Sequence, residues 1–348
     1  MYHPSLLNLL ENKIIASFLR IDFALSGSHK TIKITSMSAK YKKPTLFFPG
    51  HTACAGCGQN LTARHVINTL GPNTIVVNAT GCLEVTTTKF SESAWGVPYI
   101  HSLFENPSAV ATGVLTALKN QKKEKGTNIV IFAGDGSTFD IGFGLLAGMF
   151  ERGDNILYVC FDNEGYQNTG AQASGSSTIG ADTTTTPIGK NSMGDDKMKK
   201  NMVAFAVSQG ATYVATSTAA YPKDIEEKVK KALGFVGPKY IQILVPCIPG
   251  WGIETNKTVK VARLAATTGF YPILEIINGD VTKVLKVTAQ KPKIDDYLKL
   301  QGRYKHLFKS EDGKNIIKKL QRICDANIEV YGLCPTCEEH QILMQYKK

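Results

Sequence analysis

Residues 128–137, NIVIFAGDGS, and residues 155–168, NILYVCFDNEGYQN, decide the fold of this chain. Each stretch begins with a short run of apolar residues rich in Ile, Val or Tyr, which is typical of a buried β-strand. The first run leads directly into Gly134-Asp135-Gly136, and the second leads into Asp162-Asn163. A strand, a glycine turn, a helix and a second strand form a unit whose backbone N–H groups can approach an anion. The pattern therefore predicts a site that binds a phosphate group.

Two side chains at these strand ends have the chemistry of a divalent-cation site. Mg²⁺ prefers oxygen ligands in octahedral geometry, together with substrate phosphates. Asp135 supplies carboxylate oxygens and Asn163 supplies an amide oxygen from neighbouring strand ends. A GDG tripeptide also occurs in ordinary turns, but the strand before it and the Asn after the next strand favour a functional site. This spacing resembles the thiamine diphosphate motif.

Short β-rich runs alternate with helical patterns between about residues 50 and 250. We expect strands over residues 74–79, 128–133, 155–161, 212–217 and 240–246. Helices are expected over residues 61–70, 107–121, 143–153 and 222–235. Such alternation predicts an α/β fold, a mostly parallel sheet with helices on both faces. Because ligands of such sheets lie beyond the carboxyl ends of the strands, one edge should gather the GDG turn, Asn163, residues 80–82 and Cys247.

The chain divides into three predicted segments. Residues 1–43 form an N-terminal extension that we expect to be poorly ordered, with an amphipathic helix packed on the domain as the alternative. Residues 44–282 form the thiamine diphosphate-binding α/β domain, and residues 283–348 form a basic helical tail. Within the domain, residues 165–200 are rich in Gly, Ser and Thr and nearly devoid of apolar residues, which indicates a long loop. We expect its first half to wrap the cofactor.

Composition restricts the class of protein. The 348 residues are 43% hydrophobic and 20% charged, which suits a globular protein with a large core. No uninterrupted apolar run is long enough to cross a bilayer, so no membrane association is expected. Without a convincing signal peptide, the eight cysteines are better explained as reduced thiols or metal ligands than as a disulfide scaffold. We therefore expect a cytoplasmic protein.

The net charge of +11 is concentrated in the two tails. Residues 1–43 carry seven Lys and Arg against two acidic residues, and residues 283–348 carry fourteen against eight. A solvated face is the first interpretation, and steering of an acidic protein partner is the second. Nucleic acid is not expected as a partner, because no binding motif accompanies the charge.

The cysteines suggest a metal centre. Cys54 and Cys57 are separated by two residues, so both sulfurs can reach one centre. Glycines at 56 and 58 free the backbone around them. Cys82 and Cys247 each follow a predicted strand. The set is consistent with a [4Fe–4S] cluster, with zinc as the competing metal. Cys160 and Cys324 are interpreted as core residues. The pair Cys334 and Cys337, near His340, is left open between a redox pair, a second metal site and no function.

Several motifs, taken together, resemble one family. They are HTACAGCGQ (51–59), NATGCLEVTTT (78–88), FENPSAVATG (104–113), GDGSTFDIG (134–142), DNEGYQNTGAQ (162–172), GADTTTTP (180–187) and PCIPGW (246–251). In this order they resemble the β subunit of archaeal-type 2-oxoacid:ferredoxin oxidoreductases, most closely pyruvate:ferredoxin oxidoreductase. The resemblance covers about residues 45–305.

The resemblance implies three cofactors: thiamine diphosphate, Mg²⁺ and one [4Fe–4S] cluster. It implies that the cluster is held by Cys54, Cys57, Cys82 and Cys247. The diphosphate would face Gly134, Asp135, Gly136 and Ser137, and Mg²⁺ would be held by Asp135, Asn163 and the carbonyl of Gly165. The cofactor near its reactive ring would be lined by Gln59, Thr80, Gly81, Cys82 and Asn168, with Thr80 and Asn168 as the catalytic candidates. Gln59 is the less secure assignment, because some relatives carry an acidic residue there.

The resemblance also implies a reaction and its partners. Pyruvate would be decarboxylated oxidatively with coenzyme A to acetyl-CoA and CO₂, and the electrons would pass through the cluster to ferredoxin. The glutamate that activates the cofactor in thiamine enzymes has no candidate here, so we expect activity only with partner subunits of the alpha, gamma and delta type. The alternatives are a 2-oxoisovalerate (branched-chain) oxidoreductase β subunit, a non-redox thiamine diphosphate decarboxylase and a zinc-binding scaffold.

Overall fold

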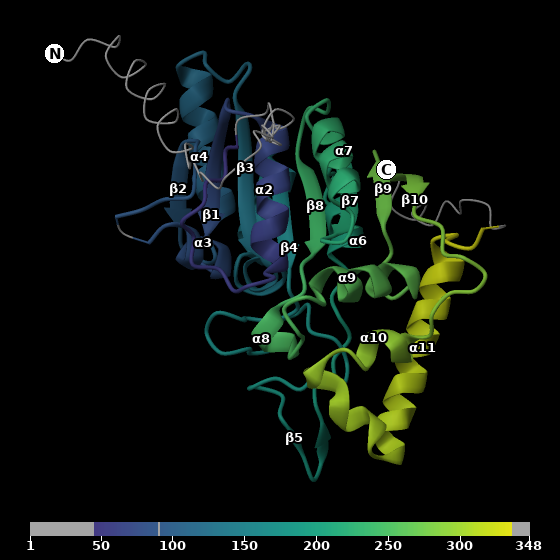
Figure 1. Ribbon diagram of the computed structural model, residues 1–348. Helices are drawn as coiled ribbons and strands as arrows, with labels where there is room; N and C mark the ends of the chain where they lie inside the picture. The colour runs from purple at the N-terminus through teal and green to yellow at the C-terminus, as the bar shows by residue number, and fades with distance from the viewer. Residues whose placement is uncertain (1–44, 90, 336–348) are drawn as a thin grey trace, which may run out of the picture. The chain divides into compact units, whose positions relative to one another are not determined.

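An eight-stranded sheet organises the computed structural model, which describes residues 45–89 and 91–335 (Figure 1). The predicted extension over residues 1–43 lies outside the described residues, as do Cys337 and His340. The spatial order of the strands is β10-β9-β7-β8-β4-β3-β1-β2. A short hairpin, β5 (Ile188–Gly189) and β6 (Ser192–Met193), forms a separate sheet within the long loop.

Six neighbouring strands of the main sheet are parallel. They are β1 (Thr74–Ala79), β2 (Tyr99–Ser102), β3 (Asn128–Gly134), β4 (Leu157–Asp162), β7 (Tyr213–Thr218) and β8 (Lys239–Leu244). At the β7 edge, β9 (Leu274–Ile277) and β10 (Asp280–Val284) continue the sheet in antiparallel pairing. Five parallel strands lie where the Val- and Ile-rich runs predict them. The polar run YIHS of β2 does not have that pattern.

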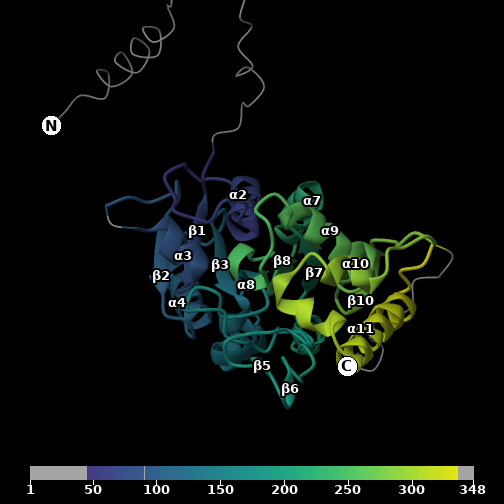
Figure 2. The same cartoon turned by 60° about the horizontal axis from the view of Figure 1, so that its bottom comes forward.

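Helices cover both faces of the sheet, because successive strand residues point to opposite sides. Val130 and Phe132 of β3 pack in the cluster that includes α2 (Gly58–Leu70) and α7 (Pro222–Ala232). Ile129 and Ile131 pack in the opposite cluster, with α4 (Pro107–Asn120), α5 (Phe143–Glu151) and α6 (Met202–Ser208). Figure 2 shows α2 and α7 on one side of the sheet and α4 on the other. The predicted fold class is confirmed.

A third apolar cluster lies beyond the carboxyl ends of the strands. It includes Trp251, Tyr297, Tyr304 and Leu320, all buried. These residues and their neighbours belong to α8 (Ile248–Trp251), α9 (Thr258–Thr267), α10 (Ile294–Leu298), η3 (Gly302–Phe308) and α11 (Glu311–Val330). Segments on both sides of residue 282 therefore share one hydrophobic cluster.

None of the helices in the described part of the chain is both long enough and apolar enough to span a bilayer.

The order of the strands creates a topological switch point between β1 and β3. The chain leaves β1 towards β2 on one side and leaves β3 towards β4 on the other. Loops at such a point diverge and leave a crevice, which is where open parallel sheets bind ligands. Residues 80–82 follow β1 and lead into α3 (Cys82–Thr87), and Asp135 leads from β3 into the short helix η2 (Gly136–Ile141). The predicted motifs thus lie at this crevice.

Candidate active site

The switch point contains a small cavity of about 40 Å³. Its walls include every residue predicted to line the cofactor: Gln59, Thr80, Gly81, Cys82, Gly134, Asp135, Gly136, Ser137, Asn163, Gly165 and Asn168. A second cavity, of about 220 Å³, shares Gln59, Cys82, Asn163 and Asn168 with the first. The two cavities are therefore neighbouring parts of one site.

Asp135 is fully buried at the base of this site. Its carboxylate accepts hydrogen bonds from the backbone N–H of Asn163 at 3.1 Å and of Gly165 at 2.7 Å, and from Ser174 Oγ at 2.5 Å. Burial, with Asp162 nearby, raises the pKa of Asp135 to about 7. A buried carboxylate in this setting favours either a proton or a bound cation, because an uncompensated charge away from water is costly.

Two oxygen-bearing groups, the Asn163 side chain and the Gly165 carbonyl, converge beside Asp135. One atom of the Asn163 side-chain amide lies 2.8 Å from the carbonyl oxygen of Gly165 and 2.9 Å from Oδ1 of Asp135. If that atom is nitrogen, it donates to both oxygens. That orientation satisfies the amide when no cation is bound, and the opposite orientation would present the amide oxygen to a cation held with Asp135 and Gly165. Adjacent ligands of octahedral Mg²⁺ lie about 3.0 Å apart when each bond is about 2.1 Å. These residues therefore fit Mg²⁺.

Two buried side-chain acceptors in the walls common to both cavities have no partner in the described part of the chain. They are Oε1 of Gln59 and Oε1 of Gln167, and both residues line the two cavities. Buried acceptors are normally satisfied, so these two are suited to donors on a ligand. The smaller cavity is narrow because the Tyr166 ring lies against Gly136, where an added Cβ would come within 2.3 Å of the ring. A ligand as large as a diphosphate needs Tyr166 to shift.

The four predicted cluster cysteines surround the larger cavity. Cys54, Cys57, Cys82 and Cys247 all line it, together with residues 245–249 that follow β8. Burial raises the pKa of Cys82 and of Cys247 to about 12, and the other cysteines of the set add to each shift. These thiols are therefore protonated without a metal, and ligation would displace their protons.

The cysteines do not meet at a point. Among the described residues, no three Cys, His, Asp or Glu side chains are close enough together to hold a single metal ion. Tetrahedral zinc with Zn–S bonds of about 2.3 Å needs sulfurs about 3.8 Å apart. A cubane of iron and sulfide is larger, so its ligands stand farther apart around it. What the described residues show is four thiols around one cavity, which is the donor chemistry of an iron–sulfur cluster. Cys160 and Cys324 are buried in the apolar clusters, as predicted.

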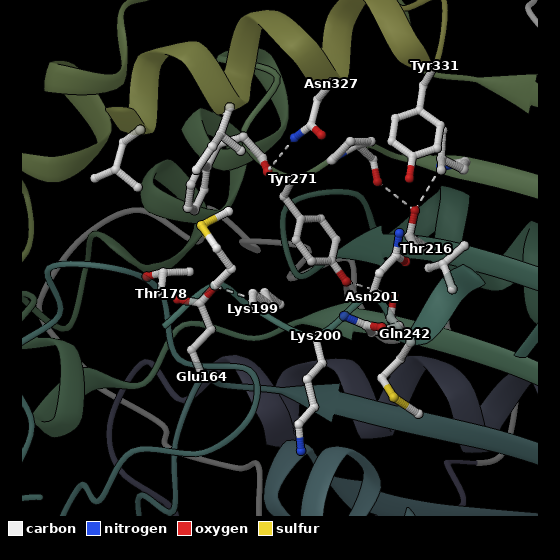
Figure 3. Close-up of a pocket in the computed structure, with 18 of the residues that line it drawn as sticks. Glu164, Thr178, Lys199, Lys200, Asn201, Thr216, Gln242, Tyr271, Asn327 and Tyr331 are labelled. Carbon is white, nitrogen blue, oxygen red and sulfur yellow. Dashed lines mark hydrogen bonds and ion pairs between the residues drawn. The ribbon is translucent and has the colours of Figure 1, made fainter. Parts of the chain in front are cut away.

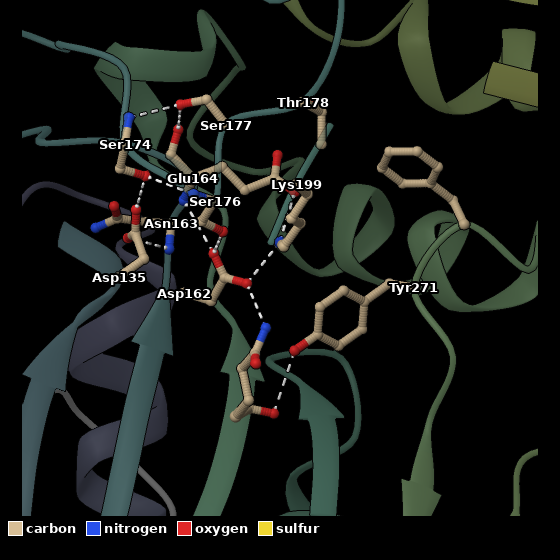
Figure 4. A network of polar contacts seen from close by, with 12 residues as sticks. Asp135, Asp162, Asn163, Glu164, Ser174, Ser176, Ser177, Thr178, Lys199 and Tyr271 are labelled. Carbon is tan, nitrogen blue, oxygen red and sulfur yellow. Dashed lines mark hydrogen bonds and ion pairs between the residues drawn. The ribbon is translucent and has the colours of Figure 1, made fainter. Parts of the chain in front are cut away.

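The long loop encloses the site on one side, as its position after Asn163 predicts. Ser174 donates to Asp135, and Ser176 donates to Asp162 at 2.5 Å. Lys199, at the end of the loop, places its ammonium 2.6 Å from Asp162 (Figure 4). Residues 165–200 therefore contribute polar contacts to the buried carboxylates of Asp135 and Asp162.

Sequence reasoning missed His101. Its Nε2 lies 2.7 Å from Oγ1 of Thr80, and Oγ1 also donates to the carbonyl of Ser102 at 3.1 Å. The donation to Ser102 leaves Thr80 to accept from the imidazole N–H. His101 belongs to β2, which lacked a strand pattern, so nothing in the sequence placed it beside Thr80.

A third cavity, of about 230 Å³, is lined by the other face of Lys199, which is partly exposed (Figure 3). Its polar wall groups are already paired: Thr216 donates to the carbonyl of Pro272, and Tyr271 donates to the carbonyl of Gln242. Of the predicted site residues, none lines it. We therefore place the chemistry at the switch point, not here.

Comparison with known proteins identifies the family. Residues 79–243 match the family described as thiamine pyrophosphate enzyme, C-terminal TPP binding domain. Pyruvate synthase subunit PorB of Methanosarcina barkeri is 49% identical over 85% of this chain and 99% of its own length. The chain belongs to the 2-oxoacid:ferredoxin oxidoreductase β subunits of the PorB type. The PorB subunit of Thermotoga maritima is 40% identical, over 86% of this chain and 95% of its own.

Other matches agree with this family. Ketoisovalerate oxidoreductase subunit VorB of Pyrococcus abyssi is 41% identical over 76% of this chain and 87% of its own. Among solved structures, 2-oxoglutarate:ferredoxin oxidoreductase from Magnetococcus marinus matches with a TM-score of 0.51 and 23% identity, covering 65% of this chain and 82% of that one. At this identity the structural match shows the fold alone. The resemblance drawn from the motifs is confirmed, and the rival non-redox decarboxylase and zinc scaffold are not supported.

Proposed function

We propose that this chain is the thiamine diphosphate-binding and iron–sulfur subunit of a pyruvate:ferredoxin oxidoreductase. The convergence of the Asp135 carboxylate, the Asn163 side-chain amide and the Gly165 carbonyl beside a cavity lined by four cysteines carries the proposal. The identity to PorB subunits supports the same assignment. The complex would convert pyruvate, coenzyme A and oxidised ferredoxin to acetyl-CoA, CO₂ and reduced ferredoxin.

The cation ligands would be Asp135, the Asn163 side chain and the Gly165 carbonyl, with the diphosphate along residues 134–137. When bound, thiamine diphosphate supplies an electron sink for loss of CO₂ from a 2-oxoacid. The chain would supply binding and orientation, and the burial of Asp135 keeps its carboxylate away from bulk water.

The cluster ligands would be Cys54, Cys57, Cys82 and Cys247. Cys82 lines both cavities, so a cluster in the larger one shares a wall with the cofactor in the smaller one. When bound, a cluster would supply a one-electron acceptor, and Cys82 would hold it at the wall that the two cavities share.

Thr80 and Asn168 would act at the reacting end of the cofactor, since both line the smaller cavity. The hydrogen bond between Thr80 Oγ1 and His101 Nε2 orients the hydroxyl and can hold a proton at Nε2. Gln59 contributes an acceptor that lacks a partner in the described chain.

The substrate is best tested in the assembled complex. Co-expression with the alpha, gamma and delta-type subunits and assay with ferredoxin and coenzyme A should give the highest kcat/KM for pyruvate among pyruvate, 2-oxoisovalerate and 2-oxoglutarate. Preference for 2-oxoisovalerate would contradict the proposal and favour the second candidate, a branched-chain oxidoreductase, which the identity to VorB supports. Asp135→Asn in the same complex is the control for activity that depends on this chain.

A further inference from the structure

The turn that carries the cation ligands has an unusual backbone. Glu164 stands between Asn163 and Gly165 and has a φ of +58°. This left-handed conformation is unfavourable for a residue with a Cβ, so it persists only where surrounding contacts hold it. Because Asn163 and Gly165 extend from either side of Glu164, the conformation of this turn sets where their oxygens lie.

Two basic residues, the buried Arg303 and the half-buried Lys199, hold the Glu164 side chain. Its carboxylate accepts from Arg303 Nη2 at 2.6 Å and from Lys199 Nζ at 3.1 Å. Glu164 is 2% exposed and Arg303 is 5% exposed, so this ion pair is screened from water. Lys199 also pairs with Asp162 (Figure 4). Two buried acids on either side of Asn163 are thus balanced by two bases from distant parts of the chain.

Trp251 joins Arg303 to Asn163. The Arg303 guanidinium carbon lies 3.8 Å from the centre of the Trp251 ring, and Trp251 Nε1 donates to the carbonyl of Asn163 at 2.7 Å. The same carbonyl accepts from Gln167 Nε2 at 2.8 Å. With its carbonyl held by two donors, Asn163 is left with its side-chain amide towards Asp135.

The same tryptophan connects the cation ligands to the cysteine cavity. Trp251 is the last residue of α8, the helix that begins directly after Cys247. Its backbone N–H donates to the carbonyl of Cys247 at 3.1 Å. One four-residue helix therefore links a wall of the cysteine cavity to the backbone of Asn163.

We propose that Arg303 and Trp251 are positioning residues for the cation. Arg303 holds Glu164 in its left-handed conformation, and Trp251 fixes the Asn163 carbonyl, so that the Asn163 amide and the Gly165 carbonyl face Asp135. The proposal rests on the proposed function, in which these oxygens bind Mg²⁺. Neither residue touches the cation in this arrangement, so loss of either should weaken cation binding without removing a ligand.

The test measures cation binding directly in the assembled complex. Mn²⁺ replaces Mg²⁺ in the presence of thiamine diphosphate, and the EPR signal of the free ion reports the bound fraction. Removal of a residue that orients metal ligands typically weakens metal binding by about 10- to 100-fold, and we expect that loss for Arg303→Met. Arg303→Lys should recover part of the affinity, because it restores the charge but not the planar stacking group.

Two further variants make the result specific. Trp251→Phe keeps an aromatic ring under Arg303 but loses the donor to Asn163, so it should also weaken Mn²⁺ binding, even if Arg303→Met fails to fold. Lys228 is 3% exposed, so it is as deeply buried as Arg303, and it forms an ion pair with Asp224 in α7. Lys228→Met removes that buried charge far from Glu164 in the sequence. It should leave Mn²⁺ affinity unchanged, which separates a local effect from general loss of a buried charge.

Asp135→Asn separates the two proposals. If the wild type binds Mn²⁺ and Asp135→Asn does not, the cation site of the proposed function stands. Wild-type affinity in folded Arg303→Met and Trp251→Phe would then overturn the positioning role alone. If the wild type itself binds no Mn²⁺ with thiamine diphosphate, or Asp135→Asn binds it equally well, the cation site and this inference both fail.

Discussion

Cys82 and Cys160 show how the position of a cysteine in the fold separates two roles that composition cannot. Cys82 begins α3 at the carboxyl end of β1 and lines both cavities of the site. Cys160 lies within β4, fully buried among apolar side chains. Cys82 lines a cavity together with the three other cysteines of the set, whereas Cys160 fills space in the core.

We expect Cys82→Ala and Cys160→Ala to differ in iron content. Loss of Cys82 removes one of four proposed ligands, so the anaerobically purified complex should lose most of the iron and sulfide assigned to this chain. Cys160→Ala should keep both and cost only core stability, because it shortens a buried side chain. Iron and acid-labile sulfide analysis gives the comparison. Full iron content in folded Cys82→Ala would contradict the proposed ligand set.

At the scale of elements, the junction of η2 with α5 depends on close backbone packing. A Cβ at Gly142 would lie 2.4 Å from the Ser137 carbonyl oxygen and 2.9 Å from that of Glu105. Both obstacles are backbone atoms, which cannot move aside as a side chain can. A Cβ at Gly144, in α5, would meet no non-neighbouring atom of the described chain within 4 Å.

Gly142→Ala should therefore destabilise the fold and Gly144→Ala should not. Overpacking of this kind costs about 1–3 kcal/mol, so we expect that loss in the free energy of unfolding for Gly142→Ala. Alanine is favoured over glycine inside a helix by about 0.5–1 kcal/mol, so Gly144→Ala should be neutral or stabilising. Urea denaturation of the full-length chain measures both. Equal stability of the two variants would show that the junction relaxes more easily than its backbone contacts imply.

At the scale of the whole molecule, we expect a partner subunit to complete the site. The Glu164 carboxylate is engaged by Arg303 and Lys199; burial alone would raise its pKa, but these two charges outweigh burial and lower it. The Glu84 carboxylate is engaged as well. Its Oε1 accepts a hydrogen bond from Thr88 Oγ1 at 2.7 Å and lies 3.6 Å from His101 Nδ1.

Two apolar side chains near the site are exposed. Leu103 and Ile141 expose 61% and 56% of their surface, which suits a face covered in an assembly.

The purified chain alone should therefore not turn over pyruvate. Supplied with thiamine diphosphate, Mg²⁺, coenzyme A and ferredoxin, it should show no ferredoxin reduction above background, and addition of the partner subunits should restore the rate. Bound cofactor and iron, measured in parallel, would confirm that the inactive chain is loaded. Turnover by the loaded chain alone would show that the activating acid is present in this sequence.

The strands and the ligand motifs could be predicted because their signals are local. Runs such as NIVIFA and LYVCF carry their own pattern, and GDG and Asn163 follow them directly. The strands β2 and β10 were missed because YIHS and DVTKV are mixed in polarity, and β9 was missed because LEII is only four residues long. The helices of residues 294–330 were expected, but not their packing against Trp251.

The sequence by itself determined the family, the parallel α/β fold and the residues that meet at the switch point, since each is encoded in short, contiguous stretches. Only the tertiary structure decided which distant groups support those residues. His101 reaches Thr80 across two paired strands, and Arg303 reaches Glu164 from 139 positions away. Such contacts depend on how the chain returns to the same place, and no local pattern of residues records that path.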